Sequence, residues 1–377
     1  MTEDTLEYLE KTLDDEGMCE FTRSFVDDLD SAMRIDVDLE SDSDWTGVIF
    51  LGMGGSGASG KFLKTISEED GGLPFVVWND YSLPSWWGPE WLVIATSYSG
   101  NTEETLSGIN EALESGGTVI GISSGGAMTE ILAMYQEAVH VPIPGGQMPR
   151  SAFGHILGAQ LAICWSLGIL IRPQEEELRE MIARLSECSK KLDFVRGDGM
   201  SEALARNLVD MEIGIVCPRV LEAPAYRLTC QINENSEAFA KHSVVPEMNH
   251  NEIVAWYNDS GRDRALVLMI CDDLDDRTNS RIAWMEENLD RKNVWKIFCE
   301  GNSLLERMIY AAHLSSDWIS VSLALIRGVS PTSMEPIPKL KEHLSKKSLD
   351  FDPTQNLAKC PKLVREAPCA IQKIKKK

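Results

Sequence analysis

The sequence contains no Cys-x-x-Cys pair, and its Cys and His residues show no spacing typical of a metal site. The nine Cys are scattered, and several lie in apolar runs, such as those ending at Cys217 and Cys271, where a thiol packs as a small hydrophobic group. This distribution argues against a disulfide framework and against a bound metal. It predicts a reducing compartment, and we expect a cytoplasmic protein.

Positive charge is scarce. The chain has 36 Lys and Arg against 59 Asp and Glu, which gives a formal net charge of −23. A field of this sign disfavours nucleic acid and anionic membranes as partners. The charge is uneven: residues 1–46 hold sixteen acidic and three basic side chains, whereas residues 359–377 hold seven basic and one acidic. A phosphorylated ligand therefore needs a pocket that is locally positive or rich in hydrogen-bond donors.

Long hydrophobic runs are also missing, with one exception. Residues 151–171 carry no charged side chain over 21 positions, which is enough for a membrane-spanning helix. Polar and small residues interrupt the stretch at Gly154, His155, Gly158, Gln160 and Ser166. We therefore expect a buried helix whose small residues allow close packing. The first residues, Met-Thr-Glu-Asp, do not resemble a signal peptide.

Short apolar runs alternate with helical patterns, which is typical of a parallel sheet covered on both faces. Five runs in the first half predict strands: Gly47–Leu51, Phe75–Trp78, Trp91–Ala95, Thr118–Ser123 and Ala138–Pro142. The pattern begins again after residue 173, with strands predicted at 213–217, 264–270 and 293–298 and helices at 277–290 and 303–327. The fold class is therefore α/β, with two doubly wound parallel-sheet domains of the flavodoxin-like or Rossmann-like three-layer type.

The two domains are predicted to cover residues 45–172 and 173–346. An acidic helical extension, residues 1–44, precedes them, and a basic tail, residues 347–377, follows them. No low-complexity linker lies between the domains, so we expect them to share a substantial interface.

Two loops follow predicted strands of the first domain, at the edge where open parallel sheets bind ligands. The first loop, Gly52–Gly60, precedes a helix predicted over 61–66. Its first, third and sixth positions match the dinucleotide-binding pattern Gly-x-Gly-x-x-Gly. A lone match is weak evidence, and Asp80, near the end of the next strand, is poorly placed to bind a ribose. Nucleotide binding is therefore disfavoured.

The second loop carries three hydroxyl groups, from Ser97, Ser99 and Thr102, directly before a predicted helix. Hydroxyls together with the free N–H groups at a helix N-terminus can bind an anion without Lys or Arg. An ordinary helix cap would explain Thr102 but would leave Ser97 and Ser99 without a role. We therefore predict a phosphate site in this loop.

A third region, Gln231–Asn235 and Pro246–Glu252, is rich in Asn, Glu and His. Glu234 lies sixteen positions before His250, and both have Asn neighbours. This composition suits a pocket for a polyhydroxylated ligand, in which a carboxylate and an imidazole transfer protons. The alternative is a capped helix followed by a polar loop.

Together with Met-Pro-Arg-Ser-Ala at residues 148–152, these motifs resemble those of the bifunctional phosphoglucose/phosphomannose isomerase family, which is built from two sugar-isomerase (SIS) domains. The resemblance covers about residues 45–345. It implies a cytoplasmic homodimer that interconverts glucose 6-phosphate and mannose 6-phosphate with fructose 6-phosphate, as in glycolysis and gluconeogenesis. The reaction would pass through an enediolate, without a metal or a cofactor. Sugar phosphates would be the partners, with no nucleic acid and no membrane.

The resemblance also implies roles for individual residues. Glu234 matches the family's base, His250 its ring-opening histidine, and Arg150 the cation that stabilises the enediolate. The segment 331–341 resembles the family's closing segment, with Lys341 as its active-site lysine and Thr332 as a candidate neighbour. The residues that match phosphate ligands are Gly55, Ser56, Ser97, Ser99 and Thr102.

Alternatives remain open. Other residues could take three of the roles: Glu237 in place of Glu234, His242 in place of His250, and Lys339 or Lys346 in place of Lys341, which also fits a solvated helix. At the level of function, the alternatives are a non-catalytic sugar-phosphate-binding regulator and an isomerase of another sugar phosphate, such as an amino-sugar or heptose phosphate. A binding module needs no proton-transfer pair, so the sequence favours the enzyme.

Overall fold

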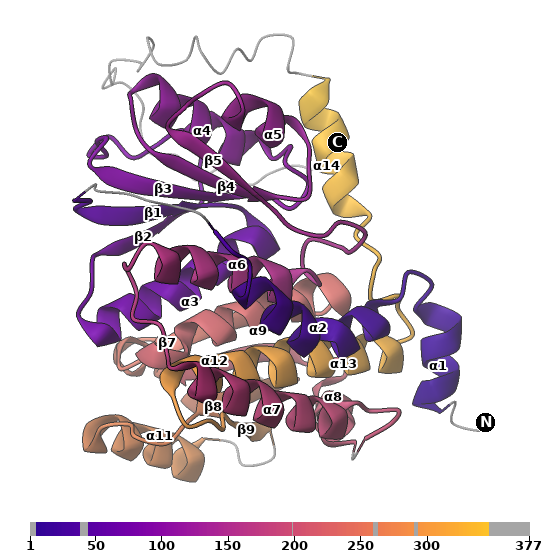
Figure 1. Cartoon of the computed structure of the whole chain (residues 1–377). Helices are drawn as coiled ribbons and strands as arrows, with labels where there is room; N and C mark the ends of the chain where they lie inside the picture. The colour runs from indigo at the N-terminus through magenta and orange to yellow at the C-terminus, as the bar shows by residue number, and fades with distance from the viewer. Residues whose placement is uncertain (1–4, 38–43, 198, 259–262, 290–292, 347–377) are drawn as a thin grey trace, which may run out of the picture. The chain divides into compact units, whose positions relative to one another are not determined.

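The computed structural model describes residues 5–37, 44–197, 199–258, 263–289 and 293–346 (Figure 1). It divides into two compact units, residues 1–333 and 334–377, and each is described by itself. The predicted basic tail, residues 347–377, lies outside the described residues, as do positions 1–4 and 38–43 of the acidic extension. The first unit contains both sheets, and the second contains helix α14 (Pro336–Ser345).

The first sheet has five parallel strands in the order β2-β1-β3-β4-β5. Their bounds are β1 Gly47–Leu51, β2 Phe75–Trp78, β3 Trp91–Thr96, β4 Val119–Ser123 and β5 Ala138–Pro142. Every residue of β1 and β4 is buried, as expected for strands covered on both faces. The five predicted strands are confirmed. The chain leaves β1 toward β2 on one side and β3 lies on the other, so the carboxyl ends of β1 and β3 flank the switch point where such sheets bind ligands.

The second sheet has four parallel strands in the order β7-β6-β8-β9. Their bounds are β6 Glu212–Pro218, β7 Ala240–Val245, β8 Arg264–Ile270 and β9 Val294–Phe298. Three of these strands are confirmed predictions, whereas the sequence pattern does not predict β7. This strand lies at the sheet edge and carries Lys241, His242 and Ser243 at its centre. Its polar centre breaks the apolar run that a central strand would show.

Helices cover both sheets (Figure 1). The α-helices of the first unit are α1 Leu6–Leu13, α2 Met18–Met33, α3 Gly54–Asp70, α4 Glu103–Glu114, α5 Ala127–Leu132, α6 Phe153–Ser166, α7 Glu175–Leu192, α8 Met200–Leu208, α9 Glu222–Asn235, α10 Ile253–Tyr257, α11 Asp276–Asn288, α12 Leu304–Ala311 and α13 Ser320–Ile326. The described residues of this unit also form two 3₁₀ segments, η1 Arg219–Leu221 and η2 Glu247–His250, and one π-helical segment, η3 Ala312–Ile319. Helix α3 contacts both α6 and α9, and these three helices lie between the two sheets.

Helix α6 is the buried helix predicted from the uncharged stretch, and it is buried from Phe153 to Trp165. Its glycines let α2 approach closely. A Cβ atom at Gly154 would lie 2.7 Å from the carbonyl oxygen of Phe25, and one at Gly158 would lie 2.8 Å from that of Leu29. The helical part of the acidic extension therefore packs directly into the main hydrophobic core.

The helix predicted at 303–327 is continuous from α12 through η3 to α13. By length and composition Leu304–Ile326 is the one helix in the described part of the chain that could cross a membrane, but 94% of its most apolar window is buried inside the protein. It packs as a core helix. Its π-helical centre was not predicted, and π segments often mark functional sites.

Candidate active site

Two helices begin at the carboxyl ends of the adjacent strands β1 and β3. The helix after β1 begins at Gly54, so the prediction of a start at Lys61 is wrong. Gly55, Gly57 and Gly60, which were predicted to lie in a loop, are helical and allow close packing. A Cβ atom at Gly55 would lie 3.0 Å from the Cα atom of Arg150. The missing side chain thus brings the first turn of α3 against the backbone at Arg150.

The predicted phosphate residues lie where these strands join their helices. Ser97 Oγ is 2.9 Å from Thr102 Oγ1 and accepts a hydrogen bond from the Thr102 N–H at 3.3 Å. Ser56, in the first turn of α3, accepts a hydrogen bond from the N–H of Tyr98 at 3.2 Å. Ser99 is exposed in the same loop. The structure therefore gathers the five residues in two adjacent segments: Gly55, Ser56, Ser97, Ser99 and Thr102.

These segments offer hydrogen-bond donors to an anion. The N–H groups in the first turns of α3 and α4 have no partner within their own helices, and both helix dipoles are positive at these ends. Thr105 Oγ1, in the first turn of α4, is buried without a hydrogen-bond partner among the described residues. Glu103 and Glu104 lie in the same turn, and their carboxylates repel an anion. Because of this repulsion, phosphate binding here would depend on the hydroxyl and N–H donors.

Arg150 lies beside these segments with 2% of its surface exposed. Its Nε donates to Asn235 Oδ1 at 2.6 Å, and its Nη2 donates to the carbonyl oxygen of Pro331 at 2.8 Å. Its Nη1 lies 3.9 Å from Oε2 of Glu234, which precedes Asn235 in α9. The two hydrogen bonds fix the guanidinium group, so the structure brings the predicted cation and the predicted base together.

Glu234 is partly buried, with 25% of its side chain exposed. Burial raises the pKa of its carboxyl group above the ordinary value of 4.5, while Arg150 and Arg227 act in the opposite direction with smaller effect. Burial also lowers the pKa of the Arg150 guanidinium. The Glu234 carboxylate raises that pKa, with a smaller effect. A carboxylate with a raised pKa beside a fixed cation is suited to take a proton from a carbon atom and to return it.

A second buried arginine supports this arrangement. Arg227, also in α9, donates from Nη2 to Asp317 Oδ1 at 2.6 Å and to the carbonyl oxygen of Arg150 at 3.1 Å. Asp317 lies in the π-helical segment and also accepts a hydrogen bond from Gln231 Nε2 at 3.0 Å. Neither Arg227 nor Asp317 belongs to a sequence motif, so neither was predicted as a site residue. Each is the single charged residue in an otherwise uncharged stretch, residues 223–233 for Arg227 and 308–326 for Asp317.

The predicted histidine is not brought to this group. His250 ends η2 and is exposed, and no hydrogen bond or ion pair joins its side chain to another residue in the part of the chain that the structure describes. His242, its alternative, is half-buried in β7, and burial lowers the pKa of its imidazole. Glu237, the alternative base, is exposed. Among the predicted proton-transfer residues, the structure thus pairs Glu234 with the buried Arg150.

The C-terminal candidates fall in different units. Thr332 follows Pro331, whose carbonyl oxygen binds the buried guanidinium, so the first unit brings Thr332 near the site. Lys341 lies in α14 of the second unit with its side chain exposed, and its place in the site stays a prediction. The alternatives Lys339 and Lys346 form ion pairs with the glutamates four positions earlier, Glu335 and Glu342.

Two doubly wound parallel sheets, with hydroxyl-rich segments at the switch point of the first, define a protein of the sugar-isomerase class. The family described as SIS domain matches residues 43–170, and the family described as bacterial phospho-glucose isomerase C-terminal SIS domain matches residues 198–344. These two matches confirm the predicted fold class.

Solved structures agree with this fold. A hypothetical protein of Thermus thermophilus is similar with a TM-score of 0.64 at 16% identity, over 92% of this chain and 94% of that chain. Tagatose-6-phosphate ketose/aldose isomerase of Escherichia coli is similar with a TM-score of 0.62 at 14% identity, over 84% of this chain and 94% of that chain. At these identities the likeness shows the fold alone.

Closer relatives give the family. The bifunctional phosphoglucose/phosphomannose isomerase of Aquifex aeolicus is 35% identical, over 80% of this chain and 91% of the relative. That of Thermoplasma acidophilum is 33% identical, over 80% of this chain and 90% of the relative. The chain belongs to the bifunctional phosphoglucose/phosphomannose isomerase family, as its motifs indicated. It is therefore a sugar-phosphate isomerase, an intramolecular oxidoreductase.

Proposed function

We propose that this protein interconverts glucose 6-phosphate and mannose 6-phosphate with fructose 6-phosphate. The observation that carries the proposal is the pair formed by Glu234 and the buried Arg150, next to hydroxyl-rich segments at the switch point of a parallel sheet. A proton acceptor, a fixed cation and an anion site are the three groups that this reaction needs.

Aldose–ketose interconversion moves a proton between C1 and C2 of the open-chain sugar through an enediolate. The Glu234 carboxylate accepts the proton from one carbon and returns it to the other. The Arg150 guanidinium, held by Asn235 and Pro331, faces the negative charge that develops on the enediolate oxygens. Because its position is fixed before the reaction, little reorganisation accompanies the charge.

Glucose 6-phosphate and mannose 6-phosphate differ at C2 and give the same enediolate. A single base can therefore serve both if the C2–C3 bond rotates in the open-chain sugar. The phosphate group would stay bound by Ser56, Ser97, Ser99 and Thr102, with the N–H groups of two helix ends, while the other end of the sugar turns.

The remaining assignments rest on the family resemblance. His250 would transfer the proton that opens the sugar ring, and Lys341 would contact the substrate, without a metal or a cofactor. We also propose a cytoplasmic homodimer, and two SIS domains at residues 45–172 and 173–346 between the acidic extension and the basic tail.

A second candidate comes from one relative. The D-glucosamine-6-phosphate 4-epimerase of Sulfolobus acidocaldarius is 28% identical, over 78% of this chain and 88% of the relative. An amino-sugar phosphate is thus the competing substrate. The non-catalytic regulator considered from the sequence has no such support, because the relatives from Aquifex aeolicus and Thermoplasma acidophilum are named as isomerases.

Purified protein incubated with a panel of hexose phosphates tests the proposal. We expect fructose 6-phosphate to form from both glucose 6-phosphate and mannose 6-phosphate, and glucosamine 6-phosphate to remain unchanged. In deuterated water, fructose 6-phosphate should acquire deuterium at C1, because the proton passes through an exchangeable base. Turnover of glucosamine 6-phosphate alone would contradict the proposal.

A further inference from the structure

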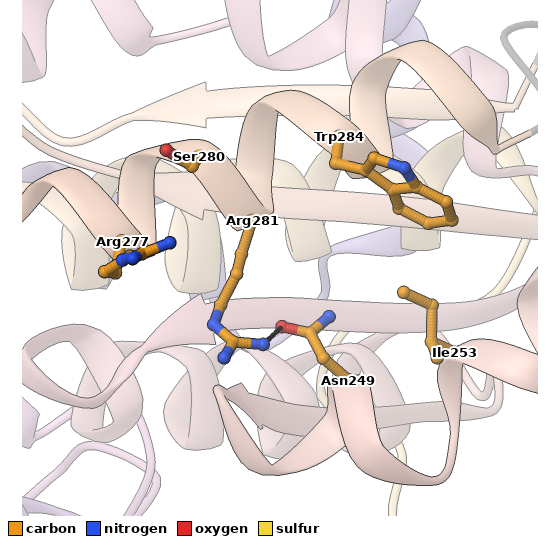
Figure 2. Close-up of a pocket in the computed structure, with 6 residues that line it drawn as sticks. All are labelled: Asn249, Ile253, Arg277, Ser280, Arg281 and Trp284. Carbon is orange, nitrogen blue, oxygen red and sulfur yellow. Dashed lines mark hydrogen bonds between the residues drawn. The ribbon is translucent and has the colours of Figure 1, made fainter.

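A groove lies in the second half of the first unit, between α11 and the segment formed by η2 and α10 (Figure 2). Its volume is about 240 Å³, and its lining residues are Asn249, Ile253, Arg277, Ser280, Arg281 and Trp284. The two walls follow the carboxyl ends of β7 and β8, the strands on either side of β6. This is the side of an open parallel sheet on which ligands bind. None of the six is a proposed catalytic or phosphate-binding residue, and Asn249 directly precedes His250.

The groove concentrates positive charge on an acidic protein. Arg277 and Arg281 are four positions apart in α11, where two like charges destabilise a helix. Neither forms an ion pair with a carboxylate among the residues that the structure describes. Arg281 Nη1 instead donates to Asn249 Oδ1, at a long distance of 3.4 Å (Figure 2). Two guanidinium groups without an ion-pair partner among the described residues, in a chain of net charge −23, indicate a site for an anion.

The other end of the groove is apolar. Trp284 lies one helical turn after Arg281 with 44% of its surface exposed, and Ile253 lies on the opposite wall (Figure 2). The Trp284 ring is stacked with Tyr257 at a centroid distance of 6.2 Å, which fixes its orientation. An exposed indole held in this way offers a flat surface to a sugar or other ring.

We infer that this groove is a second ligand site, which binds a phosphate ester whose phosphate contacts Arg277 and Arg281 and whose ring packs on Trp284. Asp275 already caps the N-terminus of α11 by accepting from the N–H groups of Arg277 and Thr278, so the side chains, not the helix end, supply the binding groups. The inference does not depend on the proposed function, because it uses none of the active-site residues.

Calorimetric titration at low ionic strength tests the site, with inorganic phosphate and ribose 5-phosphate as probes. Because the candidate active site also binds phosphate in our proposal, the titrations use the wild type and two double variants. Wild-type protein should bind two equivalents per chain. The double substitution Arg277→Gln and Arg281→Gln should weaken the binding of one phosphate equivalent by at least about tenfold, since charge-assisted hydrogen bonds are lost. The double substitution Ser99→Ala and Thr102→Ala should weaken the binding of the other phosphate equivalent.

A matched control removes the same two charges elsewhere. Arg179 and Arg206 are exposed on other helices, and replacing both by Gln should leave two equivalents bound. Trp284→Leu should weaken the binding of ribose 5-phosphate several-fold and leave the binding of inorganic phosphate unchanged. Retention of isomerase activity shows that each groove variant is folded.

Three results would overturn the inference. In the first, the wild type binds a single equivalent of phosphate, and only the Ser99 and Thr102 double variant binds it more weakly. In the second, the control without Arg179 and Arg206 loses as much phosphate affinity as the variant without Arg277 and Arg281. That result would mean that net charge alone attracts the anion. The third is dissociation of the Arg277 and Arg281 variant into smaller species in sedimentation velocity, with no change in phosphate binding. In that case the groove receives a second copy of the chain.

Discussion

Arg227 and Asp317 form an ion pair of 2.6 Å that is almost completely removed from solvent. The same Arg227 nitrogen donates to the carbonyl oxygen of Arg150, and the guanidinium lies over the ring of Phe153 at 3.9 Å. The pair thus links the π-helical segment to the backbone of the arginine that faces Glu234. Stability and catalysis should therefore both depend on it.

The first prediction concerns this ion pair. Asp317→Asn should lower the free energy of unfolding by about 3–5 kcal/mol, because it leaves a buried arginine without its counter-charge. Arg227 and His313 hold the pKa of the Asp317 carboxyl below its ordinary value of 3.8 in spite of its burial. The wild type should therefore lose this stabilisation as the pH falls below that value, whereas the variant should not. Urea unfolding at several pH values measures both effects.

Asp210 provides the control for this measurement. It pairs with Arg327 at 3.3 Å, and 87% of its side chain is exposed. Asp210→Asn should change the stability by less than about 1 kcal/mol, as exposed pairs do. Equal effects of the two substitutions would contradict the role that we give to burial.

The second prediction concerns the base. Glu234→Gln should lower kcat by about 10²–10⁴-fold and leave phosphate inhibition nearly unchanged, because only the proton acceptor is lost. Glu237→Gln, three residues further on and exposed, is the matched control and should keep most of the activity. A Glu234→Gln enzyme with more than about a tenth of the wild-type rate would remove Glu234 from the mechanism.

The third prediction concerns pH. Glu234 must be ionised to act as a base, and burial raises the pKa of its carboxyl group above 4.5. The acid limb of kcat/KM should therefore have its midpoint above 4.5, with activity lost as the pH falls through it. Arg150→Gln removes a cation that lowers this pKa, so the midpoint should move to still higher pH. Lys241→Gln, at an exposed position of β7, should not move it. A midpoint that does not change in Arg150→Gln would show that the guanidinium does not act on the base.

Much of the fold could be predicted from the sequence, because buried parallel strands form unbroken apolar runs. The exceptions have local physical causes. β7 is an edge strand with a polar centre, so its sequence resembles a loop. The start of α3 resembles a glycine loop in its sequence, yet Gly55 is helical. Its lack of a side chain lets the backbone of Arg150 approach closely. Such packing depends on a segment distant in sequence.

The candidate site divides in the same way. Ser97 and Thr102 follow a strand directly, so their proximity could be expected from the sequence. The hydrogen bond from Arg150 to Asn235 joins residues 85 positions apart, and no spacing rule predicts it. The ion pair of Arg227 and Asp317 was missed for the same reason, since only the packing of α9 against the π-helical segment brings the two charges together.

The fourth prediction concerns the phosphate segments. Ser99→Ala combined with Thr102→Ala should raise KM for glucose 6-phosphate and mannose 6-phosphate together by about tenfold or more, because two hydroxyl contacts to a charged ligand are lost. Inhibition by inorganic phosphate should weaken in parallel, and kcat should change less than KM. Ser115→Ala, at the opposite end of α4, is the control. An unchanged KM would mean that these hydroxyls serve only as a helix cap.

The last prediction concerns metal. The residues that the structure describes contain no group of three or more His, Cys, Asp or Glu side chains that could hold a metal ion. Glu234 and Arg150 can supply the base and the charge stabilisation from protein groups. Initial rates with glucose 6-phosphate and mannose 6-phosphate should therefore be the same before and after prolonged treatment with EDTA, with the metal content measured by elemental analysis.

The same assay separates the two histidine candidates. His250→Ala should lower both activities in parallel if its imidazole opens the ring of both sugars, whereas His242→Ala should lower neither. An open-chain aldose phosphate that cannot cyclise, such as erythrose 4-phosphate, should bypass the need for His250, because no ring has to open. Loss of mannose 6-phosphate activity alone on chelation, with recovery on addition of zinc, would contradict a shared metal-free mechanism: one enediolate, formed by one base, cannot require a metal for only one of its two aldose precursors.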